Sequence, residues 1–300
     1  MGMLEGKAIA VTGAGRGIGR AVALACAKAG AKVVVNDYGV SMDGSEPTSE
    51  PANEVVAEIK AAGGEAVANP SSVAEMAGGE SIIQQAMDEF GSIDGVVCVA
   101  GILREKMLFN MAEEDWDPVI ETHLKGHFTL FRAASAVMRK QKSGSLVGFT
   151  SGAFAGSVAQ ANYASAKGGI VSLVRSAAAG LHKYGVRANC IAPTAKTRMS
   201  ENVPFAIPDM GSAEDIAPMA VYLLSDAASK VTGQVYSVAG TKLAVWNQPE
   251  EVRAVYQAGG WTPESIAERL DSTIGQEKMG LLEKLEMYAK AAAAKQKPNA

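Results

Sequence analysis

The stretch that decides the fold is VTGAGRGIG, residues 11–19. A short apolar segment, 8–11, precedes it, and a segment with a helical pattern, 20–29, follows it. Glycines in such a turn let backbone N–H groups approach a phosphate, and the start of the helix adds positive potential. Strand, glycine turn and helix together predict a dinucleotide-binding unit. The residues expected to bind the cofactor here are Gly13, Arg16, Gly17, Ile18 and Gly19.

An acidic residue follows the next strand at the expected distance. Asp37 comes directly after the apolar segment 32–36, about 20 residues beyond the glycine turn. A carboxylate at this strand end accepts hydrogen bonds from a ribose 2′-hydroxyl and repels a 2′-phosphate, so we expect NAD and not NADP. Arg16 is the opposing signal, because a basic residue in the turn offers a contact for a 2′-phosphate. As a solvated turn residue, it would leave NAD the favoured cofactor.

Strand-like and helix-like segments alternate over the first 245 residues. The strands are rich in Val and Ile without polar alternation, which is typical of a parallel sheet that is buried on both faces. This alternation predicts an α/β fold, a Rossmann-type doubly wound sheet of seven parallel strands with helices on both faces. The expected strands are 8–11, 32–36, 65–68, 95–99, 144–150, 186–191 and 234–238. We expect residues 1–245 to form the NAD-binding catalytic domain and 246–300 to form a C-terminal helical extension.

Composition excludes several classes of protein. The chain has 300 residues, of which 48% are hydrophobic, and its net charge of −4 provides no basic surplus for a nucleic acid. The N-terminus lacks the pattern of a secretory signal, and no apolar stretch is long enough to span a membrane. The three cysteines are far apart and lie in apolar contexts, which indicates reduced thiols in a cytoplasmic protein and no metal site.

Tyr163 and Lys167 are four residues apart at the head of a predicted helix, so both lie on one face. An ammonium near a phenol favours the phenolate and lowers its pKa towards a value suited to proton transfer. We therefore expect this pair to be catalytic, although a pair with this spacing alone is common on protein surfaces.

The glycine turn, Ala100-Gly101 after the fourth strand, and Ser151 ahead of Tyr163 and Lys167 occur in an order that resembles the short-chain dehydrogenase/reductase family. The resemblance covers about residues 4–245. It implies reversible hydride transfer between a nicotinamide and an alcohol or ketone, in a homodimer or homotetramer. It further implies that Tyr163 is the general acid/base, that Lys167 holds the nicotinamide ribose, and that Ala100 and Gly101 contact the cofactor.

Three positions depart from the family pattern. Cys98 and Val99 stand where the family has two asparagines, so we interpret Cys98 as a packing residue. Asn69 replaces the aspartate that contacts adenine, and its amide is expected to bind the ring. His123 replaces the asparagine of the proton relay, and it is either a member of that relay or a structural histidine.

The polarising hydroxyl has two candidates. The usual spacing of 13 from Tyr163 falls on Thr150, whereas counting along the preceding strand falls on Ser151. We choose Ser151 because a strand end is more rigid than a loop, with Thr150 in reserve. The resemblance also places Pro193 beside the nicotinamide and predicts that Thr197 reaches the cofactor.

A closer resemblance, carried by VVVND (33–37), HLKG (123–126) and the polar segment 39–51, is to the (3R)-hydroxyacyl-CoA dehydrogenase unit of peroxisomal multifunctional enzymes and to its stand-alone bacterial relatives. It implies NAD-dependent oxidation of a (3R)-hydroxyacyl-CoA to a 3-oxoacyl-CoA. The alternatives are a hydroxysteroid or steroid-side-chain-CoA dehydrogenase, a 3-oxoacyl-carrier-protein reductase, and a non-catalytic NAD-binding sensor. The expected partner is a small-molecule substrate, an acyl-CoA or a steroid.

Overall fold

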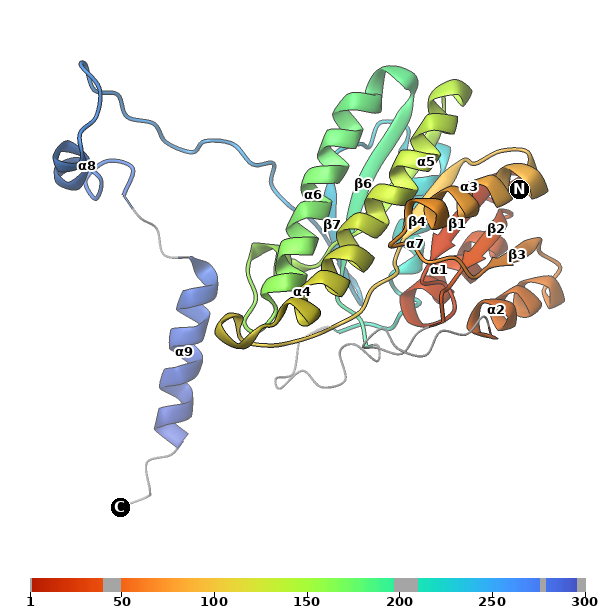
Figure 1. The fold of residues 1–300 in the computed structure, drawn as a ribbon, viewed down its shortest axis with the longest axis horizontal. Coiled ribbons are helices and arrows are strands. Elements are labelled where there is room, and N and C mark those ends of the chain that lie inside the picture. The colour runs from red at the N-terminus through yellow and green to blue at the C-terminus, as the bar shows by residue number, and fades with distance from the viewer. Residues whose placement is uncertain (1, 40–49, 197–209, 276–278, 296–300) are drawn as a thin grey trace. The chain divides into compact units, whose positions relative to one another are not determined.

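The computed structural model describes residues 2–39, 50–196, 210–275 and 279–295. The chain divides into two compact units, Met1–Trp246 and Asn247–Ala300, so the boundary lies one residue beyond the predicted one. The first unit contains the sheet (Figure 1). The second contains two helices, α8 (Pro263–Arg269) and α9 (Gly280–Lys295). Thr262 caps the start of α8, with its hydroxyl accepting the Ser265 N–H at 3.2 Å.

The sheet has the doubly wound order that the sequence predicts. Its strands are hydrogen-bonded in the order β3-β2-β1-β4-β5-β6-β7-β8, and all neighbours before β8 run parallel. The chain reverses direction of winding between β1 and β4, so a crevice opens there at the carboxyl ends of the strands. The strands are β1 Ala8–Thr12, β2 Lys32–Asn36, β3 Ala66–Asn69, β4 Gly95–Cys98, β5 Gly144–Phe149, β6 Val186–Pro193, β7 Val235–Ala239 and β8 Lys242–Val245.

An eighth strand corrects the predicted count of seven. β8 pairs antiparallel with β7, with Ala239 opposite Lys242 across a two-residue turn. Gly240 has a φ of +52°, which a tight hairpin turn requires at that position. The prediction missed this strand because it is short and mostly exposed, and so lacks the apolar run of the buried strands.

Trp246 follows β8 and binds the end of the first unit to β7. Its backbone N–H donates to Val235 O at 2.9 Å, and its indole Nε1 donates to Ser237 Oγ at 2.8 Å. The indole ring packs on Phe154 with the ring centroids 4.6 Å apart. Side chain and backbone therefore both hold Trp246 to β7.

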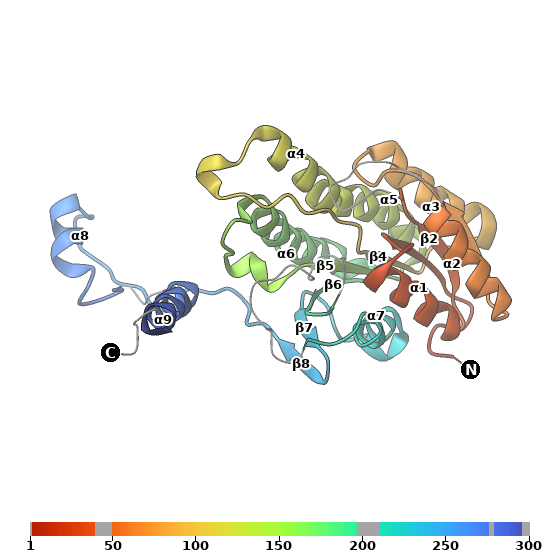
Figure 2. The ribbon, with the colours of Figure 1, turned by 90° about the horizontal axis from the view of Figure 1, so that it is seen from below.

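Helices cover both faces of the sheet (Figure 2). Apolar side chains of α1, α2 and α7 form the core on one face, and those of α3, α5 and α6 form the core on the other. These helices and α4 are α1 Gly17–Lys28, α2 Glu50–Ala61, α3 Met76–Phe90, α4 Glu113–Ile120, α5 Gly126–Gln141, α6 Ala161–Leu181 and α7 Ala217–Leu224. The strands buried on both faces explain the continuous Val-rich runs of the sequence.

The stretch from α4 to α5 is not one continuous α-helix. A π-helix, Glu121–Lys125, separates α4 from α5. Such a wider turn is rare and frequently occurs at functional sites. Here it carries His123, one of the residues singled out in the sequence.

Candidate active site

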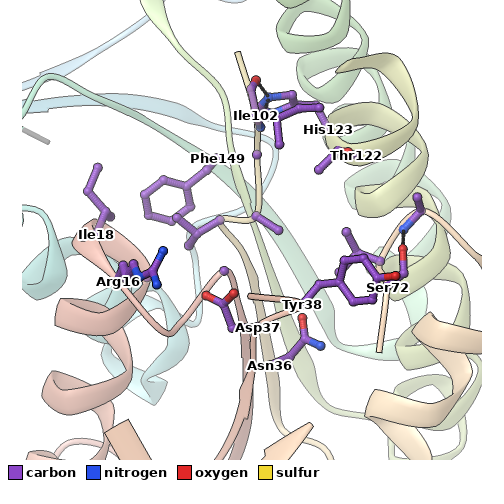
Figure 3. A pocket seen from close by; sticks show the side chains of 18 of the residues that line it. Arg16, Ile18, Asn36, Asp37, Tyr38, Ser72, Ile102, Thr122, His123 and Phe149 are labelled. Atoms are coloured by element: carbon purple, nitrogen blue, oxygen red, sulfur yellow. Dashed lines mark hydrogen bonds between the residues drawn. The ribbon is translucent and has the colours of Figure 1, made fainter. Parts of the chain in front are cut away.

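A cleft lies at the carboxyl ends of the central strands (Figure 3). Its walls come from the glycine turn, the ends of β2, β5 and β6, the segments after β3 and β4, the π-helix and α6. The predicted site residues that line it are Gly13, Arg16, Gly17, Ile18, Gly19, Asp37, Ala100, Gly101, His123, Tyr163, Lys167 and Pro193. Residues predicted from separate parts of the sequence thus meet in one cleft.

The glycine turn leaves room for a ligand against its backbone. Gly13 has a φ of +63°, and a Cβ there would lie 2.7 Å from Ala100 Cα. Both the backbone conformation and the lack of space therefore exclude a larger residue. A Cβ at Gly19 would overlap the carbonyl oxygen of Gly13. Arg16 precedes α1 in an extended conformation, and its side chain does not cap the helix. This cradle suits a pyrophosphate group at the start of α1.

Asp37 is fixed beside the glycine turn. Its Oδ2 accepts the Gly15 N–H at 2.7 Å and its Oδ1 accepts the Gly39 N–H at 2.7 Å. Both bonds come from the backbone, so the carboxylate cannot swing away from the cleft without losing them. Arg16 is exposed and lines the same cleft (Figure 3).

Asn69 lies beneath the cleft and does not line it. Its side chain is buried, donates to Gln85 Oε1 at 2.8 Å and accepts the Ser71 N–H at 2.9 Å. Ser71 and Ser72 form the wall above it. The amide predicted to bind adenine is therefore engaged with the protein in this structure.

Thr12 is a site residue that the prediction passed over. Its buried hydroxyl accepts the N–H groups of Val99 and Ala100 at 3.2 and 3.3 Å. The bonds tie the end of β1 to the segment after β4, and so hold Ala100 and Gly101 at the cleft. The sequence signal that could have identified Thr12 as a site residue is its position directly before the glycine turn.

Tyr163 and Lys167 project from one face of α6, as their spacing predicts. The Lys167 Nζ lies 5.3 Å from the centroid of the tyrosine ring. Burial raises the pKa of Tyr163 above its ordinary value, while a hydrogen bond with Ser151 opposes that rise. The expectation that the pKa of this phenol is lowered is therefore wrong for this structure, because desolvation outweighs the hydrogen bond.

Lys167 is a buried cation with a backbone partner. Its side chain is 4% exposed, and Nζ donates to Phe149 O at 2.6 Å. Burial lowers the pKa of Lys167 to about 7, since no carboxylate is among the groups that influence it. The amine can therefore gain or lose a proton near neutral pH, which the sequence did not predict.

The two hydroxyl candidates have different partners. Thr150 lines the cleft, but its hydroxyl is buried and donates to the backbone oxygen of Lys167 at 2.8 Å. Ser151 Oγ accepts the Ala153 N–H at 3.2 Å, and its hydroxyl lies close enough to the Tyr163 phenol to lower the pKa of that group. Ser151 is thus the hydroxyl beside the phenol.

His123 lies edge-on against Tyr163, with ring centroids 5.2 Å apart at 87°. Its Nε2 lies 2.9 Å from Ile102 O and 3.2 Å from Ile102 N (Figure 3). Its Nδ1 is buried and has no partner within the described part of the chain. Burial and the charge of Lys167 lower the pKa of His123 well below its ordinary value, so the ring is neutral.

Comparison with known proteins agrees with this geometry. The family model for short chain dehydrogenases matches residues 7–205. The chain belongs to this family. A short-chain dehydrogenase from Mycobacterium avium has 44% sequence identity, with a TM-score of 0.83 over 92% of this chain and 97% of that one.

Two curated relatives are similar over most of the dehydrogenase unit. The hydroxyacyl-CoA dehydrogenase ChsB1 of Mycobacterium tuberculosis is 40% identical over 284 residues, which cover 89% of this chain and 88% of the relative. The peroxisomal multifunctional enzyme type 2 of Mus musculus is 41% identical over 232 residues, 76% of this chain but 31% of that longer protein.

A short-chain dehydrogenase is an oxidoreductase that uses NAD or NADP, and the cleft fits such a cofactor. The glycine cradle would hold the pyrophosphate, Asp37 would face the adenosine ribose, and Lys167 would reach the nicotinamide ribose. Pro193, at the end of β6, also lines the cleft. Thr197 lies outside the described residues.

The described residues of this short-chain dehydrogenase contain neither a membrane-spanning helix nor a metal-binding cluster. None of its described helices is both long and apolar enough to cross a membrane. Within the same residues, His, Cys, Asp and Glu side chains form no cluster of three or more that would hold a metal ion.

Proposed function

We propose that the chain oxidises a (3R)-hydroxyacyl-CoA to a 3-oxoacyl-CoA with NAD, in a homodimer or homotetramer. The observation that carries the proposal is the grouping of Tyr163, Ser151 and Lys167 beside a cleft that fits a dinucleotide. The relatives named hydroxyacyl-CoA dehydrogenase and peroxisomal multifunctional enzyme support the choice of substrate class.

Three side chains, those of Ser151, Tyr163 and Lys167, have separate roles in the proposed oxidation. Ser151 holds the substrate oxygen, and Tyr163 is the general base that removes the hydroxyl proton, with the Ser151 hydroxyl favouring the phenolate against the burial that raises the pKa of Tyr163. The bound nicotinamide supplies the acceptor for the hydride that leaves C3. Lys167 favours the phenolate when its amine is charged, and its proton exchange near neutral pH suits a relay towards solvent.

His123 is proposed as a further member of that relay. Its buried Nδ1 has no partner in the described residues, and its ring touches Tyr163. A neutral imidazole can accept a proton at one nitrogen while it releases one at the other. Replacing His123 with Phe is expected to slow turnover and to leave cofactor binding intact.

NAD is proposed over NADP because Asp37 is fixed at the cleft by two backbone bonds. A 2′-phosphate there would meet a carboxylate that cannot retreat. An Asp37→Ser variant should accordingly lose preference for NAD.

The three buried free cysteines, which suit a reducing compartment, support the proposal of a cytoplasmic location.

The test is a substrate panel read by NADH or NADPH formation. The purified chain is given each cofactor with (3R)- and (3S)-hydroxyacyl-CoA thioesters, a hydroxysteroid and a steroid-side-chain CoA thioester. Turnover of the (3R)-thioesters with NAD, lost in Tyr163→Phe, is the expected result. Binding of NADH without turnover of any 3-hydroxyacyl-CoA would refute the proposal, and turnover of the steroids alone would replace it.

A further inference from the structure

His127 is a second buried histidine beside the active site, and no sequence motif singles it out. It is the second residue of α5, directly after the π-helix that carries His123. Its ring is 1% exposed and packs between Phe131, with centroids 6.0 Å apart, and the backbone of Gly148. A Cβ at Gly148 would lie 3.3 Å from Cδ2 of the ring, a tight contact that would require a shift of a few tenths of an ångström.

Both ring nitrogens of His127 face backbone groups. Nδ1 lies 2.6 Å from the carbonyl oxygen of His123, and Nε2 accepts the Phe149 N–H at 3.1 Å. Since a carbonyl only accepts and an N–H only donates, these partners select the neutral tautomer with its proton on Nδ1. Burial lowers the pKa of His127 to about 3, so the ring keeps this form at neutral pH.

The two backbone groups belong to residues that hold the reacting side chains. His123 is the residue whose ring contacts Tyr163. Phe149 is the residue whose carbonyl oxygen accepts the ammonium of Lys167 at 2.6 Å. His127 therefore stands between the two groups that flank Tyr163, and it bridges the π-helix to the end of β5.

We propose that His127 is a positioning residue, which fixes the backbone at His123 and Phe149 and thereby sets where the His123 ring and the Lys167 ammonium lie relative to Tyr163. The inference rests on the proposed function for its kinetic part only. The His123 carbonyl belongs to the π-helix and also accepts the Gly126 N–H, so the His127 ring is its second donor, in a type of turn that frequently occurs at functional sites. A side chain with two rigidly spaced nitrogens can span the gap to the neighbouring strand.

Three substitutions separate the two bonds. His127→Asn keeps a short donor for the His123 carbonyl but does not reach Phe149. His127→Gln places its amide oxygen towards the Phe149 N–H and leaves the His123 carbonyl without this donor. His127→Phe fills similar space and makes neither bond, and His182→Phe, at an exposed histidine outside the cleft, is the matched control.

The measurements are kcat and KM for the 3-hydroxyacyl-CoA, together with the Kd of the reduced cofactor from fluorescence titration. His127→Phe is expected to lose roughly 10²-fold in kcat, the effect of a displacement of about 1 Å, with little change in the KM for the thioester. Cofactor affinity should fall about tenfold in the Phe and Asn variants, because Lys167 is no longer held through Phe149. His127→Gln should keep the affinity of the wild type and lose kcat.

The cofactor titration works whether or not the thioester is the substrate, so failure of the proposed function does not hide the result. A merely structural ring would lower Tm and leave kcat and cofactor affinity unchanged in every variant that folds. That outcome, or equal losses in the Asn and Gln variants, would overturn the proposal. If His127→Phe does not fold, the contrast between Asn and Gln decides alone.

Discussion

A methyl group added at Gly101 should test how rigidly His123 is held. A Cβ there would overlap Cε1 of the His123 ring and lie 2.9 and 3.0 Å from its two nitrogens. Non-bonded atoms rest about 3.5–4.0 Å apart, so the ring has to move by roughly 1 Å. It is 1% exposed, bonded to Ile102 and in contact with Tyr163, so a displacement of the ring breaks or compresses at least one of these contacts.

Gly101→Ala is therefore expected to cost about 1–3 kcal/mol of unfolding free energy, the usual range for overpacking. Activity should fall by roughly 10²-fold, because the displaced ring presses on Tyr163. In a His123→Ala background the obstacle is absent. There the same substitution should be neutral or stabilise by about 0.4–1 kcal/mol, since alanine restricts the unfolded chain.

Urea unfolding of the four proteins of this double-mutant cycle gives the coupling energy. Gly180→Ala is the control, because a Cβ at this exposed site of α6 meets nothing within 4 Å. An equal cost of Gly101→Ala in both backgrounds would refute the rigid contact. A large cost of Gly180→Ala would show instead that the measurement reports a general intolerance of alanine.

Further predictions follow from single residues. Ser151→Ala should reduce kcat by roughly 10²-fold, whereas Thr150→Val should lose about 1 kcal/mol of stability through its bond to Lys167 O; kinetics and unfolding of both variants separate the roles. Between pH 7 and 10.5 the unfolded chain binds a proton at Lys167 that the folded chain has released, so this residue makes stability rise with pH. Urea unfolding at pH 7 and pH 9 should show a smaller rise in Lys167→Met. The native protein should resist alkylation, since burial raises the pKa of Cys26 to about 12; rapid labelling of folded protein would contradict this.

The doubly wound fold was predictable because its strands are buried on both faces and therefore lack polar alternation. β2 has the bounds that the sequence predicts, since apolar residues fill it from Val33 to Val35. β8 was missed because an exposed edge strand has no such signal. The interruption at 121–125 was missed because a π-helix keeps an apolar face similar to that of an α-helix.

The site was predictable where function depends on spacing along one element. Tyr163 and Lys167 share a face of α6, and strand geometry placed Ser151 beside the phenol. The role of His127 depends on backbone atoms of two other elements, and no pattern of side chains encodes such contacts. The lowered pKa of Lys167 likewise depends on burial that only the assembled cleft creates.

The contacts of Trp246 with β7 and with Phe154 determine where the chain can be truncated or fused to another sequence. A polypeptide ending at Ala239 would leave one edge of β7 without its partner and remove the ring that packs on Phe154, three residues beyond Ser151. One ending just after Trp246 keeps both. The first unit should therefore accept a foreign sequence after Trp246, and a fusion partner attached there would leave the loop of Ser151 supported.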